Sequence, residues 1–118
     1  MKISFEGKGL SRADAAAIAK RVKHLEDKEA IGYPPTIGRR TRQKYFNIIA
    51  DKEIKEHRAG TEQDRMLELF LNGCSFPEAG KHLGWDYKQL FEYITRSHER
   101  LGYGFIEDSK GMIFLVTH

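Results

Sequence analysis

The stretch that decides the fold runs from Phe76 to Thr95 and reads FPEAGKHLGWDYKQLFEYIT. Its apolar residues recur at three- and four-residue spacing on both sides of Gly84, which is the pattern of two short amphipathic helices. Glycine adopts positive φ without steric cost, so Gly84 suits the tight turn between them. Asp86 can cap the second helix with its side-chain oxygen, and Gly102 is a natural end for that helix. The stretch therefore predicts two helices that pivot on a glycine.

Small and apolar residues within the stretch fit close packing of these two helices. Ala79 and Gly80 are expected where the helices touch, and Leu83 is the last apolar residue of the first helix. The residues expected to face inward from the second helix are Leu90, Tyr93 and Ile94.

A further helix is expected directly before the pair. Gly60 ends the preceding segment, and Thr61 with Asp64 forms a capping-box pattern of the Thr-x-x-Asp kind. The apolar stripe of this helix is made by Met66, Leu67, Phe70 and Leu71.

The chain after Gly102 predicts a β-hairpin. Two strands, Phe105–Ile106 and Met112–Val116, flank the polar turn Glu107–Gly111. Three helices and a C-terminal hairpin in this order, over Thr61–His118, resemble the winged helix-turn-helix superfamily. The resemblance implies an α+β, mainly helical fold in which the second helix of the pair meets DNA.

Composition sets the outer limits of the fold. A chain of 118 residues with 40% hydrophobic content can bury a core without disulfides. We expect residues 1–60 to form a helical segment with a basic arm, joined to the winged part, 61–118, in one compact unit.

No apolar run is long enough for a membrane span, and Met1–Phe5 alternates instead of forming the apolar part of a signal peptide. The single cysteine, Cys74, cannot form an internal disulfide, which suits a reducing compartment. We therefore expect a soluble cytoplasmic protein without a membrane partner.

The N-terminal half reads as one strand, two helices and a connector. A short strand over Met1–Glu6 is expected to extend the sheet of the hairpin. One helix is predicted over Ser11–Glu29 and a second long helix over Thr41–Gly60. The glycines and prolines of Ile31–Gly38 indicate an extended connector between them.

The net charge of +3 is unevenly distributed along the chain. Residues 30–60 carry 7 Lys and Arg against 3 Asp and Glu, a net charge of +4. Residues 61–118 carry 6 against 9, a net charge of −3. Because non-specific affinity for nucleic acid comes mainly from neutralising phosphates, an acidic winged part binds a duplex well only if its cations gather on one side.

The densest positive charge lies where the connector meets the second helix. Arg39, Arg40, Arg42 and Lys44 stand within six residues, directly before Tyr45. We predict that they form a phosphate-binding arm. Tyr45 could stack on a base, which leaves binding of RNA or single-stranded DNA open. The alternative is a solvated basic face that pairs with the acidic C-terminal half.

The resemblance places a DNA-reading surface on the outward side of the second helix of the pair. The contacts expected from this helix are Tyr87, Lys88, Gln89, Thr95 and Arg96. Lys81 is expected to reach the flanking backbone, and Lys110 to be the contact of the hairpin tip, or wing. Asp86 and Glu92 repel phosphate, so binding of a protein by the same scaffold stays open.

Enzymatic chemistry is not indicated by any motif. The chain has no Gly-rich phosphate loop, no His-Glu-x-x-His pair and no Cys-x-x-Cys. Cys74, His82 and His98 are the candidates for a nucleophile or a metal set, but a lone cysteine usually behaves as a small hydrophobe. We therefore expect no catalytic residue, no metal and no cofactor.

The sequence thus predicts a double-stranded DNA-binding protein that acts by occupying its site. Its size and pattern are typical of small bacterial or phage regulators of transcription or replication, and a homodimer is an open alternative. The alternative function is that of an adaptor, which uses the helix-turn-helix scaffold to bind a protein of the transcription or replication machinery.

Overall fold

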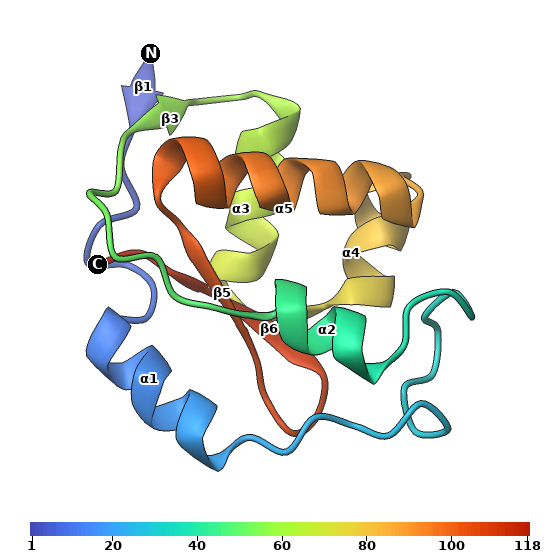
Figure 1. Cartoon of the computed structure of the whole chain (residues 1–118). Helices are drawn as coiled ribbons and strands as arrows, with labels where there is room; N and C mark the ends of the chain where they lie inside the picture. The colour runs from blue at the N-terminus through green and yellow to red at the C-terminus, as the bar shows by residue number, and fades with distance from the viewer.

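The computed structural model describes all 118 residues as an α+β fold with five helices and two antiparallel sheets (Figure 1). The helices are α1 (Arg12–Arg21), α2 (Arg39–Tyr45), α3 (Glu62–Leu71), α4 (Phe76–Leu83) and α5 (Tyr87–Leu101). The strands are β1 (Lys2–Ile3), β2 (Asn47–Ile48), β3 (His57–Arg58), β4 (Cys74–Ser75), β5 (Gly104–Glu107) and β6 (Met112–Val116). In Figure 1, α5 passes in front of α3, and α1 and α2 lie below it.

The turn between α4 and α5 has the geometry that the sequence predicts. Gly84 takes a left-handed φ of 70°, and the Asp86 side chain accepts a hydrogen bond of 2.9 Å from the first turn of α5. A Cβ on Gly80 would lie 3.3 Å from the carbonyl oxygen of Trp85 and 3.5 Å from the Cδ1 atom of Leu90. The small residue therefore lets the two helices approach closely.

The C-terminal half follows the order α3, β4, α4, α5, β5, β6, and β4 returns to pair with β6. The larger sheet has the strand order β2-β5-β6-β4, with every pair antiparallel. At the start of α3, the Thr61 hydroxyl accepts a hydrogen bond of 3.1 Å from the backbone N–H of Asp64. The three predicted helices of this half and its hairpin are confirmed.

The first strand of the hairpin is longer than predicted by two residues, because Gly104 and Glu107 also belong to β5, and Glu107 is therefore not part of the turn. The Asp108 carboxylate accepts hydrogen bonds from the backbone N–H groups of Lys110 and Met112, both at 2.9 Å. Because this carboxylate and Gly111, at a φ of 84°, complete the turn, Glu107 remains in the sheet opposite Ile113.

One apolar core joins the two halves of the chain. Phe5 and Phe46 from the N-terminal half pack in the same cluster as Phe70 of α3 and Phe105 of β5. Of the residues predicted to face inward from α5, Leu90 and Ile94 are buried. Tyr93 is only half-buried, because its ring stacks on Trp85 at the surface, with ring centres 4.7 Å apart.

The two N-terminal helices are shorter than predicted. α1 ends at Arg21, not near Glu29, because Val22 is already extended and His24 is held at the hairpin by Glu107. α2 ends at Tyr45 instead of continuing to Gly60. The next residues form β2 and pair with β5, where Asn47 lies opposite Ile106 and Ile48 opposite Phe105. Tertiary pairing here overrides the helical periodicity of the sequence.

The N-terminal strand is also shorter than predicted and has a different partner. β1 pairs with β3, with Lys2 opposite Arg58, and not with the hairpin. β2 pairs with β5, and β4 pairs with Met112 and Ile113 of β6. At the other end of β6, Leu10 and not β1 joins the hairpin, through a parallel bridge with Val116. His57 of β3 is buried and is held at 2.7 Å by the Asp64 carboxylate and at 3.0 Å by the Tyr103 hydroxyl.

Candidate functional site

The outward side of α5 carries charges of both signs. Lys88, Glu92 and Arg96 are exposed. The Arg96 guanidinium pairs with the Glu92 carboxylate and lies 5.6 Å from the centre of the Tyr93 ring. Lys88 forms no ion pair. The half-buried residues at the edges of this side are Gln89 and Thr95. Of the two cations on this side, Arg96 is neutralised by Glu92, and Lys88 is not neutralised within the protein.

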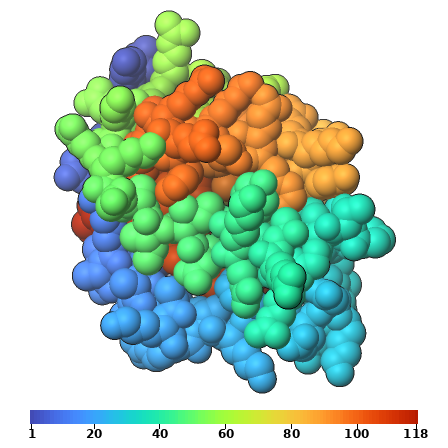
Figure 2. All heavy atoms as spheres, viewed as in Figure 1, coloured from blue at the N-terminus to red at the C-terminus, as the bar shows by residue number.

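α2 lies directly beside α5 (Figure 1). The ring of Tyr45 is 4.4 Å from the ring of Phe91 on α5, and the ring of Phe46 is 5.9 Å from it. Figure 2 shows the surfaces of the two helices adjoining on this face of the molecule. The predicted arm and the predicted DNA-reading helix thus belong to a single face.

Two of the four predicted arm cations point outward from α2. Arg40 and Lys44 are exposed and lie one helical turn apart. Neither forms an ion pair, although the Lys44 ammonium lies 5.6 Å from the centre of the Tyr45 ring. Together with Lys88 they give this face three unpaired cations. We call α2 and the outward side of α5 the α2–α5 face.

Arg42 corrects the prediction of a fully basic arm. Its side chain is 1% exposed, and its guanidinium donates hydrogen bonds to the backbone carbonyls of Leu25 and Ile37. It also lies 3.4 Å from the Asp27 carboxylate and 5.2 Å from the centre of the Tyr33 ring. Arg42 therefore ties the connector to α2 and does not reach a phosphate.

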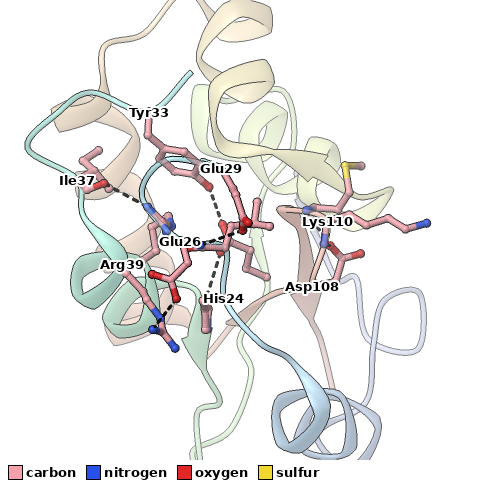
Figure 3. Close-up of polar contacts among 12 residues, drawn as sticks. His24, Glu26, Glu29, Tyr33, Ile37, Arg39, Asp108 and Lys110 are labelled. Carbon is pink, nitrogen blue, oxygen red and sulfur yellow. Dashed lines mark hydrogen bonds and ion pairs between the residues drawn. The ribbon is translucent and has the colours of Figure 1, made fainter. Parts of the chain in front are cut away.

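Arg39 is held partly by the acidic turn Glu26–Glu29, which also contributes the Asp27 carboxylate beside Arg42. Its backbone N–H donates to the Asp27 carboxylate at 2.8 Å, and its guanidinium lies 3.1 Å from the Glu26 carboxylate (Figure 3). The side chain is still half-exposed. The acidic turn Glu26–Glu29 thus neutralises two of the cations that the sequence assigns to the arm.

A buried carboxylate that sequence reasoning missed fixes the connector to the hairpin. Glu107 is 1% exposed and accepts hydrogen bonds from the Tyr33 hydroxyl at 2.6 Å and the His24 ring at 3.0 Å. Figure 3 labels His24 and Tyr33, and dashed lines from their side chains mark these two hydrogen bonds. Burial and the Glu107 charge raise the pKa of Tyr33 far above its ordinary value. The sequence signal that could have placed Glu107 in the strand is the segment Asp108–Gly111, because these four residues form the turn without it.

The remaining predicted contacts lie outside the α2–α5 face or at its edge. Lys81 is exposed on α4, 3.8 Å from the Glu78 carboxylate. Lys110 is exposed at the hairpin turn. The turn lies close to the segment before the connector, since a Cβ on the adjacent Gly111 would be 3.5 Å from the Leu25 side chain. Tyr87 is half-buried and lines a cavity of about 420 Å³ between the connector and the α4–α5 turn. Of these residues only Tyr87 belongs to α5, and none of them belongs to α2.

A second cavity, of about 310 Å³, opens between α2 and α5. Its lining residues are Lys44, Tyr45, Ile48, Thr95, His98 and Glu99. It combines an aromatic ring and an aliphatic side chain with a cation, a carboxylate and a hydroxyl. The cavity therefore offers both stacking and hydrogen bonding on the α2–α5 face.

The candidates for catalytic or metal chemistry stay apart. No group of three His, Cys, Asp or Glu side chains is placed to hold a metal ion. Cys74 is buried in β4, and burial raises the pKa of its thiol. His82 is exposed on α4, whereas His98 on α5 makes a hydrogen bond of 3.0 Å with the carbonyl oxygen of Tyr103.

Comparison with protein-family models, with curated proteins and with solved structures finds no match to this chain. None of its helices combines the length and the apolar character needed to cross a membrane.

Proposed function

We propose that residues 61–118 form a winged helix-turn-helix and that the protein binds double-stranded DNA. The order α3, β4, α4, α5, β5, β6 supports the fold, as does the pairing of β4 with β6. The left-handed Gly84 between α4 and α5 supports the helix-turn-helix. In this proposal α5 enters the major groove and the β5–β6 hairpin is the wing, with Lys110 at its tip.

The observation that carries the proposal is the position of α2 beside α5. The acidic C-terminal half lacks the positive charge that phosphate binding requires. Arg40 and Lys44 supply unpaired cations on α2, which lies beside the helix that carries the unpaired Lys88. They contact phosphates in the proposed complex, while Gln89 and Thr95 lie at the edges of the helix that reads the bases.

The proposed mode of action is occupancy of a DNA site, as in small bacterial or phage regulators of transcription or replication. A regulator of this kind needs affinity and sequence discrimination, and it performs no chemistry on the DNA. The cytoplasm is the location that this role implies. This part of the proposal rests on the resemblance to the winged-helix superfamily.

Fluorescence anisotropy with a labelled random duplex tests DNA binding. We expect the Lys88→Ala variant to bind more weakly and to reduce the slope of log affinity against log salt concentration by about 1, because one phosphate contact is lost. Arg65→Ala is the matched control, because Arg65 is an exposed cation of α3 beside the α3–α4 cavity, outside this face. Equal slopes for the two variants, or no duplex binding at low salt, would contradict the proposal.

An adaptor that binds a protein is the second candidate function. It is favoured by the half-exposed Trp85–Tyr93 stack, which lies on the flank of α5 away from α2. The Tyr93 hydroxyl donates to the Glu62 carboxylate at 3.2 Å, so acidic and aromatic groups meet there. Half-exposed aromatic side chains beside carboxylates suit a protein partner better than a phosphate backbone.

A further inference from the structure

The cavity between α2 and α5 has two unlike walls. Tyr45 and Ile48 form an aromatic and aliphatic wall, and the ring of Phe91 backs Tyr45 at 4.4 Å. Thr95 and Glu99 form a polar wall on α5. The volume of about 310 Å³ falls at the lower end of the range found for small-ligand pockets, about 300–1,000 Å³. A flat, polar-edged ring is the shape that such walls fit.

We propose that this cavity holds a single unpaired nucleobase of the bound DNA. The inference rests on the proposed function and specifies it further, because a duplex interrupted by an unpaired base becomes the preferred ligand. The Tyr45 ring provides the stacking surface, and stacking of one base on an aromatic side chain contributes about 1–3 kcal/mol. The Lys44 ammonium, now 5.6 Å from the centre of that ring, is displaced by the base and meets the adjacent phosphate.

The polar wall selects bases that carry an amino group. The Glu99 carboxylate only accepts hydrogen bonds. His98 lies 3.0 Å from the Tyr103 carbonyl through its Nδ1 atom, so Nδ1 donates to that carbonyl, and in the neutral ring Nε2 is an acceptor. An unpaired cytosine presents its 4-amino donor to such acceptors, whereas an unpaired thymine presents its one N3–H donor between two carbonyl oxygens, which the carboxylate repels. An unpaired cytosine is therefore preferred to an unpaired thymine.

Three labelled duplexes of one sequence test the inference by anisotropy. One is fully paired, one carries a single bulged cytosine and one carries a bulged thymine. We expect the cytosine bulge to bind roughly tenfold more tightly than the paired duplex, through stacking and the acceptor contact. The expected preference for the cytosine over the thymine bulge is roughly fivefold.

Two alanine variants of α5 provide a matched comparison. Glu99→Ala and Glu92→Ala both remove one exposed carboxylate from α5, but only Glu99 lines the cavity. We expect the ratio of cytosine-bulge to thymine-bulge affinity to fall to about 1 in Glu99→Ala and to stay at roughly five in Glu92→Ala. Tyr45→Leu should abolish the gain from either bulge. If Tyr45→Leu fails to fold, as judged by circular dichroism, the comparison of Glu99→Ala with Glu92→Ala still tests whether the cavity holds the base.

Each outcome distinguishes the inference from the proposed function. If the paired and bulged duplexes bind with equal affinity, the cavity holds no base and the inference is wrong, while DNA binding stands. A preference for both bulges that Glu99→Ala leaves unchanged would overturn the assignment of the polar wall. Absence of binding to all three duplexes at low salt would overturn the proposed function and the inference together.

Discussion

Arg42→Ala is expected to lower the free energy of unfolding by about 3 kcal/mol. The guanidinium is 1% exposed and joins α2 to the backbone carbonyls of Leu25, before the connector, and Ile37, within it. Its removal leaves the carbonyls of Leu25 and Ile37 without this donor and opens a cavity under Tyr33. Urea denaturation of the variant and the wild type measures the loss.

Arg40→Ala is the control for this prediction, because Arg40 is exposed and lies two residues away on α2. Its stability should stay within about 0.5 kcal/mol of the wild type, as for most surface substitutions. Its affinity for duplex DNA should fall, because a phosphate contact is lost. The reverse pattern, a stable Arg42→Ala and an unstable Arg40→Ala, would show that the two roles are assigned wrongly.

Glu107→Ala is the second substitution with a large expected effect, also about 3 kcal/mol of stability. The change leaves the buried His24 ring and the Tyr33 hydroxyl without their shared acceptor. Residues 22–38, which include the connector, should also become more accessible, and limited proteolysis of this segment detects the change. Glu107→Gln, which keeps an acceptor oxygen for Tyr33, should lose less than Glu107→Ala. A loss below about 1 kcal/mol in Glu107→Ala would mean that the carboxylate does not hold the connector.

The helices and hairpin of the C-terminal half could be predicted because their signals are local. Gly84 fixes the turn through its own backbone, and Thr61 and Asp86 cap helices that begin at the next residue. Such signals act within four residues, so one sequence is enough to find them. The contacts of Lys88, Gln89 and Thr95 with DNA stay predictions.

The N-terminal half was predicted less well because its structure depends on residues distant in the sequence. α2 ends where Asn47 and Ile48 join β5, about 58 residues later in the chain. Arg42 is buried because Asp27 and the connector lie over it, which a run of four cations does not reveal. Of the four cations in this run, only Arg40 and Lys44 are exposed and form no ion pair, and their binding of phosphate stays a prediction.

We propose that α2 and α5 form one DNA-binding face. The most direct test is the slope of log affinity against log salt concentration for a random duplex, measured for the wild type and the Arg40→Ala/Lys44→Ala double variant. We expect the slope to decrease in magnitude by about 2 in the double variant, since about 0.9 is lost for each phosphate contact removed. An unchanged slope in a folded double variant would show that α2 takes no part in DNA binding.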